Sequence, residues 1–502
     1  MMISSRCVLL VFSSHLALGL TAMAAPAGQN DSGKPNILML FVDDLRPEIG
    51  AYGVPRALTP AIDHLGKKSS VFTRAYCQYP VCGPSRASLL SGLAPDQITV
   101  YGNNRAKIRG RVADFVSMPQ LFQQAGYETV SIGKVYDKRV RDDRGWDAEL
   151  LVDNSEKLYA HPENQQRHEE NATAKFRTAS RPWKAGPVTE IGGEGRGQYF
   201  DEKIAETACE ELDRLSKSGK PFFLAVGLHL PHLPFAAPKA FWDLYDRSQI
   251  ELPTFDAPPD GLPDVAFWPW LELRAYEPIP QEGPLEEAMA RELIHGYLAS
   301  TSFVDSLIGT ILAQLKSDGM EDNTIVVLLG DHGYHLGELG QWVKYVNTEL
   351  ASRAPLMIKT IGVAPRRVES PVEFIDIYPT LAAMAGLAAP KDLPGRDLTA
   401  LMRGGDTPES LQRPALTQLL RFGRAMGHSL RKGDFRYNLW THPTSGKVIA
   451  EELYDYRPDG IETTNLATDK THAATKAALR KELESLSTQR GWSGRVEGDG
   501  ND

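Results

Sequence analysis

Residues 82–86 read Cys-Gly-Pro-Ser-Arg and place a cysteine ahead of a predicted helix. A proline fits the first position of a helix and Gly92 offers a stop, so Cys82 is expected near a helix N-terminus. The free N–H groups and the macrodipole at such an end favour a thiolate or a bound oxyanion. An isolated cysteine is more often a buried structural residue, so the rest of the chain must decide between the two interpretations.

Two pairs of potential metal ligands lie far apart in the sequence, Asp43 with Asp44 and Asp331 with His332. Adjacent carboxylates at a buried strand end repel each other strongly unless a cation is present. Either pair alone is compatible with an exposed turn, but together they predict a divalent metal site. Three carboxylates suit Ca²⁺ or Mg²⁺, whereas the imidazole leans toward a softer metal, so the ligands alone leave the ion open.

Basic and proton-transferring side chains complete the candidate site: Arg86, Lys134, His229, His232 and Lys344. Each of them alone is more often a surface cation or a packing residue. In combination they describe a pocket for a tetrahedral dianion, in which a metal and cations bind the oxygens and a histidine protonates a leaving oxygen.

Four short apolar runs precede these groups and predict the strands that position them. The runs are residues 36–42, 129–132, 222–226 and 324–329, and they lead into Asp43, Lys134, His229 and Asp331, respectively. Continuous apolar runs suit strands buried on both faces, and the helical patterns between them favour an α/β fold with a parallel or mixed sheet. Ligands bind outside the carboxyl ends of strands in such sheets, so these groups are expected to converge on one crevice.

Helical patterns cover 201–217 and 286–316, the second long enough for two helices. Two stretches, 151–197 and 251–285, are predicted to be irregular, and the second, rich in proline and tryptophan, is interpreted as a substrate rim. Past residue 393 the pattern changes to a hairpin over 425–440, a further strand over 452–454 and a closing helix over 473–486.

The composition is that of a globular protein of 502 residues, 42% of them hydrophobic. The net charge of -9 gives no global electrostatic case for binding nucleic acid or an anionic membrane. The N-terminus has the order of a secretory signal and is too short and interrupted to span a bilayer. The expected organisation is therefore a signal peptide over 1–24, a catalytic α/β domain over 25–392 and a smaller α+β domain over 393–502.

The mature chain keeps three cysteines, Cys77, Cys82 and Cys209, so at least one of them is unpaired in an exported protein. This count suggests one special thiol. If that thiol is Cys82, the sequence does not say whether Cys77 and Cys209 pair.

The order of these motifs resembles that of the type I (formylglycine-dependent) sulfatases, most closely the iduronate-2-sulfatase branch. The stretches that carry the resemblance are 36–46, 81–86, 131–135, 222–234, 261–266, 331–338, 342–345 and 452–454. The resemblance covers essentially the whole mature chain. It implies an alkaline-phosphatase-like fold: a large mixed, mostly parallel sheet sandwiched by helices, plus a smaller C-terminal α+β domain with an antiparallel sheet.

The resemblance also implies a metal centre and a modified residue. Asp43, Asp44, Asp331 and His332 would bind one ion, with the modified Cys82 as a further ligand. The family implies Ca²⁺ rather than Mg²⁺ or another divalent ion, which agrees with the majority of carboxylates. The modification is formylglycine, made from the signature cysteine by a formylglycine-generating maturation enzyme.

The implied catalytic residues surround that modification. Lys134 and Arg86 would hold the hydrated formylglycine, and His229 and Lys344 would contact the sulfate and its leaving oxygen. One hydroxyl of the hydrate attacks sulfur, and deprotonation of the other expels sulfate and restores the aldehyde.

Position 137 departs from the family pattern. After Gly133, Lys134 and Val135 the family has an aromatic residue and then a histidine, but this chain has Tyr136 and Asp137. The hypothesis here is that Asp137 acts as the general base of the second step, with His232 as a fallback.

The resemblance further implies a substrate class, 2-O-sulfated uronic acid in glycosaminoglycans or similar polysaccharides. Candidate substrate-binding residues are His232, Tyr334, His335, Tyr345 and Arg105, the last in a basic string that is equally compatible with a solvated loop. An exported enzyme is expected, in the periplasm, secreted or lysosomal according to the host.

Three rival interpretations stay open at this point. The first is a sulfatase for another ester, of a different sugar, of choline or of an aryl alcohol. The second is a formylglycine phosphonate or phosphodiester hydrolase, and the third is a noncatalytic protein that binds sulfated glycans.

Overall fold

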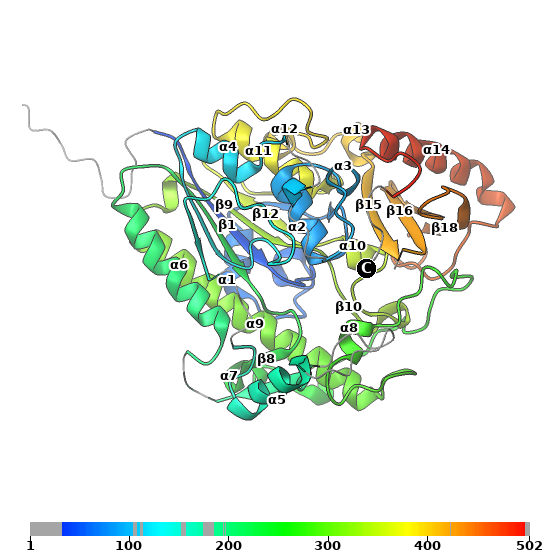
Figure 1. The fold of residues 1–502 in the computed structure, drawn as a ribbon, viewed down its shortest axis with the longest axis horizontal. Helices are drawn as coiled ribbons and strands as arrows, with labels where there is room; N and C mark the ends of the chain where they lie inside the picture. The colour runs from blue at the N-terminus through cyan, green and yellow to red at the C-terminus, as the bar shows by residue number, and fades with distance from the viewer. Residues whose placement is uncertain are drawn as a thin grey trace, which may run out of the picture.

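Strand β1 (Asn36–Val42) lies near the middle of an eight-stranded sheet (Figure 1). The strand order is β13 (Arg366–Val368), β2 (Ser70–Phe72), β12 (Leu356–Lys359), β9 (Thr324–Gly330), β1, β7 (Phe222–Leu228), β4 (Glu128–Gly133) and β5 (Ala148–Leu150). The strands from β9 to β5 are parallel, and β12 runs antiparallel to β9 and β2. This arrangement confirms the predicted mixed sheet. The computed structural model describes residues 33–103, 108–110, 114–151, 157–173, 185–193, 195, 197–421 and 423–496.

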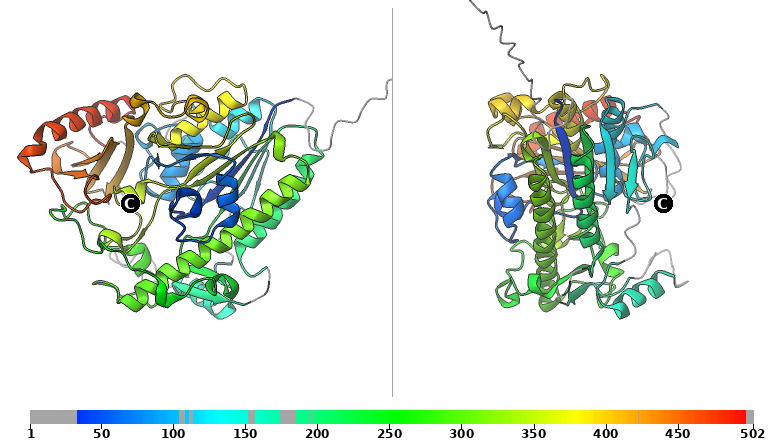
Figure 2. Two further views of the ribbon diagram at one scale, coloured as in Figure 1. Left: turned by 180° about the vertical axis from the view of Figure 1, so that it is seen from behind. Right: turned by 90° about the vertical axis from the view of Figure 1, so that its left-hand side faces the viewer.

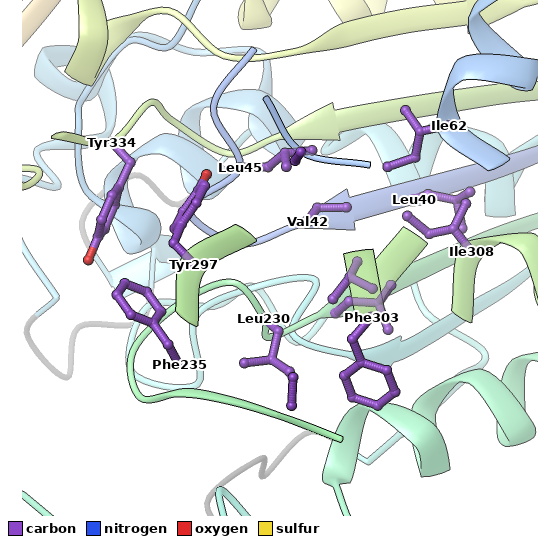
Figure 3. Close-up of a cluster of buried hydrophobic side chains, with 14 of the residues drawn as sticks. Leu40, Val42, Leu45, Ile62, Leu230, Phe235, Tyr297, Phe303, Ile308 and Tyr334 are labelled. Carbon is purple, nitrogen blue, oxygen red and sulfur yellow. The ribbon is translucent and has the colours of Figure 1, made fainter. Parts of the chain in front are cut away.

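Helices cover both faces of this sheet because its central strands are apolar along their whole length. Leu40 and Val42 of β1 belong to one core and Met39 and Phe41 to the other. The first core packs under α1 (Pro60–Gly66), α6 (Phe200–Ser216) and α9 (Glu287–Ser317), and the second under α2 (Cys82–Ser91), α4 (Met118–Gln124), α11 (Ile377–Met384) and α12 (Thr399–Gly404). Figure 3 shows part of the first core, where Ile308 of α9 lies near Leu40.

Helix α9 runs unbroken for 31 residues, so the stretch that was long enough for two helices forms one. Among the helices that the structure describes, only α9 is long and apolar enough to cross a membrane by length and composition. Most of its apolar window is buried inside the protein, and it packs against α6 and β8 (Phe235–Pro238). These contacts are those of a core helix.

A four-stranded antiparallel sheet stands at one end of the molecule, beside the large sheet (Figure 2, left). It consists of β15 (Ala415–Arg421), β16 (Ala425–Lys432), β17 (Phe435–Thr441) and β18 (Val448–Asp455), and α14 (Ala473–Gln489) covers it. The predicted hairpin, last strand and closing helix are all present. Leu398 and Met402 precede this sheet and pack in the second core of the large one, so the domain boundary at 393 stays a prediction.

The remaining elements are short and connect or flank the two sheets. They include α3 (Pro95–Ile98), α5 (Pro162–Thr173), α7 (Lys239–Trp242), α8 (Leu271–Arg274), α10 (Glu349–Ser352), α13 (Pro408–Leu411), β3 (Ala75–Tyr76), β6 (Thr189–Gly192), β10 (His335–Leu336), β11 (Trp342–Val343) and β14 (Val372–Glu373).

The stretch 151–197 is not wholly irregular, because it contains α5 and also β6, which pairs with β8. Helix α5 is polar nearly throughout, so it lacks the apolar stripe by which sequence reasoning recognises a helix. The carboxylate of Glu190 fixes its start by accepting bonds from the N–H groups of Ala160 and His161 and from the side chain of Asn164.

The cysteines of the described chain are all free thiols: Cys77, Cys82 and Cys209. Cys77 lies in the second core, whereas Cys209 lies on α6, against the first core, so the sheet separates them. The two therefore do not pair. The predicted signal peptide over 1–24 lies outside the described residues.

Candidate active site

The carboxyl ends of four neighbouring parallel strands, β9, β1, β7 and β4, meet at one edge of the large sheet. Val42, the last residue of β1, pairs in register with the last residues of β7 and β9. Asp43, His229 and Asp331 follow directly, and Lys134 follows β4. The structure thus brings together the groups that the sequence predicts at four separate strand ends, as expected for a parallel sheet.

The predicted metal ligands form one buried cluster. One ligand atom each of Asp43, Cys82, Asp331 and His332 lies within 4.8 Å of the other three. Nε2 of His332 is 3.3 Å from Sγ of Cys82 and 3.4 Å from Oδ1 of Asp44. Nδ1 of His332 lies 2.8 Å from a backbone carbonyl oxygen, to which it must donate. A ring that donates from Nδ1 turns its Nε2 toward the carboxylates, where this nitrogen can bind a divalent cation.

The charges around this cluster also fit a cation. Four buried carboxylates face three buried cations: Asp43, Asp44, Glu272 and Asp331 against Arg86, Lys134 and Lys344. When the histidines are left out of the count, one negative charge remains, and a divalent ion makes the balance positive. A pocket with that balance suits a sulfate dianion.

Arg86 lies behind the metal ligands and is fully buried. Its Nε donates to Asp331 at 2.8 Å, its Nη2 to Asp43 at 3.1 Å, and its Nη1 to the carbonyl oxygens of Lys134 and Val135. Burial acts to lower the pKa of Arg86, but the two carboxylates outweigh it and raise that pKa. Because every guanidinium nitrogen is already bonded to these groups, Arg86 positions the metal ligands. Its contact with the hydrated formylglycine, which the resemblance implies, stays a prediction.

Lys134 bridges the metal cluster and the signature cysteine. Its Nζ is bonded to Asp43 and lies 4.0 Å from Sγ of Cys82. Burial disfavours the charged form, but Asp43 raises the pKa of Lys134 well above its usual value. Lys134 is therefore a fixed cation beside the cysteine.

Cys82 is the first residue of α2, as predicted, and Gly92 ends the helix with a φ of 73°. Pro84 is the third helical residue and not the first. The expected thiolate is wrong for the unmodified residue, because burial and the Asp43 carboxylate raise the pKa of the Cys82 thiol well above its usual value. The N-terminus of α2 presents Cys82 to the metal cluster, but it does not ionise the thiol.

Two histidines from the loop after β7 line the same pocket. The ring centroids of His229 and His232 are 4.8 Å apart. Nδ1 of His229 is 3.9 Å from Oδ2 of Asp43. The buried carboxylate of Asp201 accepts the N–H groups of His229 and Leu230, both at 2.8 Å, and so fixes this loop. Burial, Lys134 and His232 hold the pKa of His229 well below its usual range, so its ring is neutral.

Glu272 of α8 joins His232 to Lys344. It lies 3.1 Å from Nε2 of His232 and 3.1 Å from Nζ of Lys344, which also binds Asp44 at 2.9 Å. Burial acts to lower the pKa of Lys344, but Asp44 and Glu272 raise it. The result is a permanent cation held by two carboxylates.

The backbone on either side of Lys344 is strained. Val343 has a φ of 67° and Tyr345 a φ of 74°, values that β-branched and bulky residues rarely adopt. Such backbone persists where the surroundings fix it, and it is common at functional sites.

The geometry does not support the general-base role predicted for Asp137. Its Oδ1 accepts Nε of Arg139 at 2.8 Å, and its Oδ2 accepts Nη2 at 2.9 Å. Burial acts to raise the pKa of Asp137, but Arg139 and Lys134 lower it to about 2. A carboxylate with both oxygens occupied and so low a pKa is a weak base.

The predicted substrate-binding residues fall into different places. Tyr334 is buried and stacks on Tyr297, with ring centroids 5.6 Å apart (Figure 3). His335 is fully buried and uses both ring nitrogens, on Glu338 and Thr348. His335 therefore has no ring nitrogen left for a sugar. The Tyr334 ring borders the site, because Nζ of Lys344 lies 5.9 Å from its centroid.

Tyr345 and His232 do lie at the site. Tyr345 stacks on Trp268 at 4.8 Å, which puts the tryptophan-rich stretch 251–285 at the site as its predicted rim. A nitrogen of His232 lies within 4.8 Å of Sγ of Cys82. Arg105 lies outside the described residues.

Sequence reasoning missed Glu272, Asp201 and Arg139. Glu272 sits in a stretch without periodicity, and Asp201 looks like an ordinary acidic residue in the first turn of a helix. Arg139 had a signal that could have been used, because an arginine two residues after a carboxylate that stands in an unexpected place suggests a local pair.

A profile of the sulfatase family matches residues 35–387. The chain belongs to the sulfatase family. It is therefore a sulfuric ester hydrolase, which agrees with the resemblance seen in the sequence. Iduronate 2-sulfatase of Mus musculus is 30% identical to this sulfatase over 93% of the present chain and 98% of its own.

Solved structures share its fold. A structure described as a 2-O GAG sulfatase matches with a TM-score of 0.70 and 22% identity, over 91% of this chain and 92% of the other. A phosphonate monoester hydrolase of Agrobacterium radiobacter matches with a TM-score of 0.73 and 23% identity, over 91% and 96%. At such identities these two similarities establish the fold alone.

Proposed function

We propose that this sulfatase hydrolyses the 2-O-sulfate ester of uronic acids in sulfated saccharides, through a formylglycine made from Cys82. The observation that carries the proposal is Cys82 at the start of α2, beside buried metal donors and 4.0 Å from Lys134. Similarity to an iduronate 2-sulfatase over nearly the whole chain supports the uronic acid as the sugar.

A modification is needed because the unmodified thiol is a poor nucleophile at neutral pH. Burial and Asp43 keep Cys82 protonated by raising its pKa. Formylglycine, once formed and hydrated, supplies a hydroxyl for attack on sulfur and a second hydroxyl whose deprotonation releases sulfate. Lys134 lies where it can donate a hydrogen bond to an oxygen on that side chain.

The metal proposed for the cluster is Ca²⁺, with Asp43, Asp44, Asp331 and His332 as ligands beside the modified Cys82. Hard carboxylate oxygens outnumber the single imidazole, which favours Ca²⁺, with Mg²⁺ less well suited because it demands strict octahedral geometry. When bound, the ion supplies positive charge to a sulfate oxygen and lowers the pKa of a hydroxyl that binds it.

His229 and Lys344 act on the substrate in this proposal. Lys344 is a permanent cation that neutralises sulfate charge as it develops. His229 is neutral in the pocket without substrate, since burial and Lys134 depress its pKa. An anionic sulfate ester beside the ring favours its protonation, after which His229 can protonate the leaving sugar oxygen.

The proposal includes a formylglycine-generating maturation enzyme as a partner and export from the cytoplasm, in agreement with the signal-like N-terminus. Sulfated mono-, oligo- or polysaccharides are then the substrates met outside the cytoplasm.

The test is release of sulfate from a panel of defined compounds, using protein whose Cys82 conversion has been measured by peptide mass. The panel contains a disaccharide with a 2-O-sulfated uronic acid, its 6-O-sulfated counterpart, choline sulfate, an aryl sulfate and a phosphonate monoester. We expect the 2-O-sulfated uronic acid to have the highest kcat/KM. Faster hydrolysis of any other compound would overturn the substrate, and a preference for the phosphonate would overturn the reaction class.

A pair of cysteine variants tests the role of Cys82. Cys82→Ser should lower kcat by at least about 1000-fold, the scale seen when a covalent nucleophile is removed. Cys209→Ser, a matched change at a partly buried cysteine of α6, should retain the wild-type kcat. Glycan binding without turnover by fully converted protein would instead indicate a noncatalytic binding protein.

A further inference from the structure

The turn that carries Asp137 packs against the helix that carries the signature cysteine. The N–H of Val140 donates to the carbonyl oxygen of Asp137 at 2.9 Å, which closes the turn. A Cβ placed on Gly83, the second residue of α2, would lie 3.1 Å from Cγ2 of Val140. The turn is thus fixed beside the N-terminus of α2, next to Cys82.

Asp137 holds the guanidinium of Arg139 in one orientation. Two parallel bonds join them, Nε to Oδ1 at 2.8 Å and Nη2 to Oδ2 at 2.9 Å, and the backbone N–H of Arg139 adds a third at 3.0 Å. The carboxylate is nearly fully buried, whereas the side chain of Arg139 is 46% exposed. A buried anion therefore anchors a cation whose outer part faces solvent.

Arg139 lies near the catalytic pocket, because its turn is fixed beside the N-terminus of α2. Among the described residues, Nη1 of Arg139 makes no hydrogen bond. The pair with Asp137 raises the pKa of Arg139, and Cys82 and Tyr345 contribute to this shift, so both lie within its electrostatic range. Tyr345 stacks on Trp268 of the rim. Arg139 is therefore near both Cys82 and the aromatic rim.

We infer that Arg139 binds the carboxylate of the uronic acid in the substrate, and that Asp137 is a positioning residue for Arg139. A guanidinium held on one edge keeps its other N–H groups free for a second carboxylate, and its planar geometry suits that group. The inference rests on the proposed function, because it assigns a binding partner to the uronic acid named there. The inference also gives Asp137 a role, that of positioning Arg139, which does not require a basic carboxylate.

The experiment compares three substrates: the 2-O-sulfated uronic acid disaccharide, the same compound with its carboxylate converted to the methyl ester, and an aryl sulfate. For the wild type, we expect the methyl ester to have a KM about 10-fold to 100-fold above that of the acid, the range of a charge-assisted pair. Arg139→Ala should raise the KM of the acid by the same factor, leave the ester and the aryl sulfate unchanged, and keep kcat within about threefold.

Two further variants separate positioning from catalysis. Asp137→Asn should raise the KM of the acid and leave kcat for the aryl sulfate unchanged, whereas a general base would lower kcat for every substrate. Arg141→Ala is the matched control, because Arg141 lies on the same loop and pairs with Glu149, and it should behave as the wild type.

The outcomes distinguish the inference from the function on which it rests. If the wild type releases no sulfate from the acid but hydrolyses the aryl sulfate, the proposed substrate is wrong and the inference falls with it. If the wild type hydrolyses the acid but Arg139→Ala has the same KM for acid and aryl sulfate as the wild type, the inference alone is wrong. Equal KM values of the wild type for acid and methyl ester would also overturn it.

Discussion

Glu272 offers the sharpest test of how the pocket is organised, because a single carboxylate joins His232 to Lys344. The change Glu272→Gln keeps the size of the side chain and removes its charge. Two unit charges 3.1 Å apart attract by about 5 kcal/mol at an effective dielectric constant of about 20. That figure is an upper bound, because Lys344 keeps Asp44 at 2.9 Å.

The net effect is closer to that of one charge-assisted hydrogen bond, about 1.5–3 kcal/mol. If the loss falls on the transition state, kcat decreases by about 10-fold to 100-fold. KM should not increase, because removing a negative charge makes the pocket more attractive for an anionic ester. Lower kcat without higher KM is therefore the expected signature.

The assay is steady-state sulfate release, corrected for Cys82 conversion by peptide mass. The matched control is Glu373→Gln, which removes a buried carboxylate paired with Arg490 at 2.7 Å. The control should lower the unfolding temperature but keep kcat per folded molecule. A Glu272→Gln enzyme with kcat within twofold of the wild type, or with KM raised at unchanged kcat, would refute this reasoning.

Three further predictions concern stability and the metal. Arg436 lies 2.8 Å from Glu349 and 3.3 Å from Glu462, and Arg436→Met leaves both buried carboxylates without this cation. The free energy of unfolding in urea should therefore fall by about 3–5 kcal/mol. A decrease below about 1 kcal/mol would contradict this expectation. Burial lowers the pKa of His335 to about 4. The neutral ring therefore contributes its full stabilisation of the folded protein above pH 6.5, and this contribution is lost as the pH falls toward 4. Between pH 7.5 and 5 the wild type should lose about 2 kcal/mol more than His335→Gln in urea unfolding, and equal losses would exclude this titration. Exhaustive EGTA treatment should abolish sulfate release and lower the unfolding temperature, and Ca²⁺ should restore both better than Mg²⁺; activity that survives chelation would exclude an essential metal.

The parts of the fold that could be predicted are those in which burial imposes a local pattern. Strands β1 and β9 are continuously apolar because both of their faces are covered, and this fixed their bounds within a residue. The convergence of Asp43 and Asp331 followed from the geometry of parallel sheets. Helix α5 escaped prediction because a polar helix has no periodic apolar face.

The site was predictable only where the chemistry is local to a motif. The buried state of His335 depends on Glu338 and Thr348, and the role of Glu272 depends on a one-turn helix from another part of the chain. These contacts have no signature in the sequence around His335 or Glu272. The bond between Asp137 and Arg139 spans two residues, yet it too required the structure, because the sequence does not say whether a nearby arginine turns toward a carboxylate or toward solvent.

The position of Arg86 explains how so many charges can be buried in one place. Isolated, each carboxylate of the metal cluster would carry a desolvation cost of several kcal/mol. Arg86 binds Asp43 and Asp331 from behind, and its remaining nitrogen is bonded to backbone carbonyl oxygens of the Lys134 loop. The carboxylates are therefore held at fixed positions by this buried cation. Their front sides stay directed at Cys82 and His332. A divalent cation at this site would therefore be bound by groups already in place, and its binding would require little reorganisation.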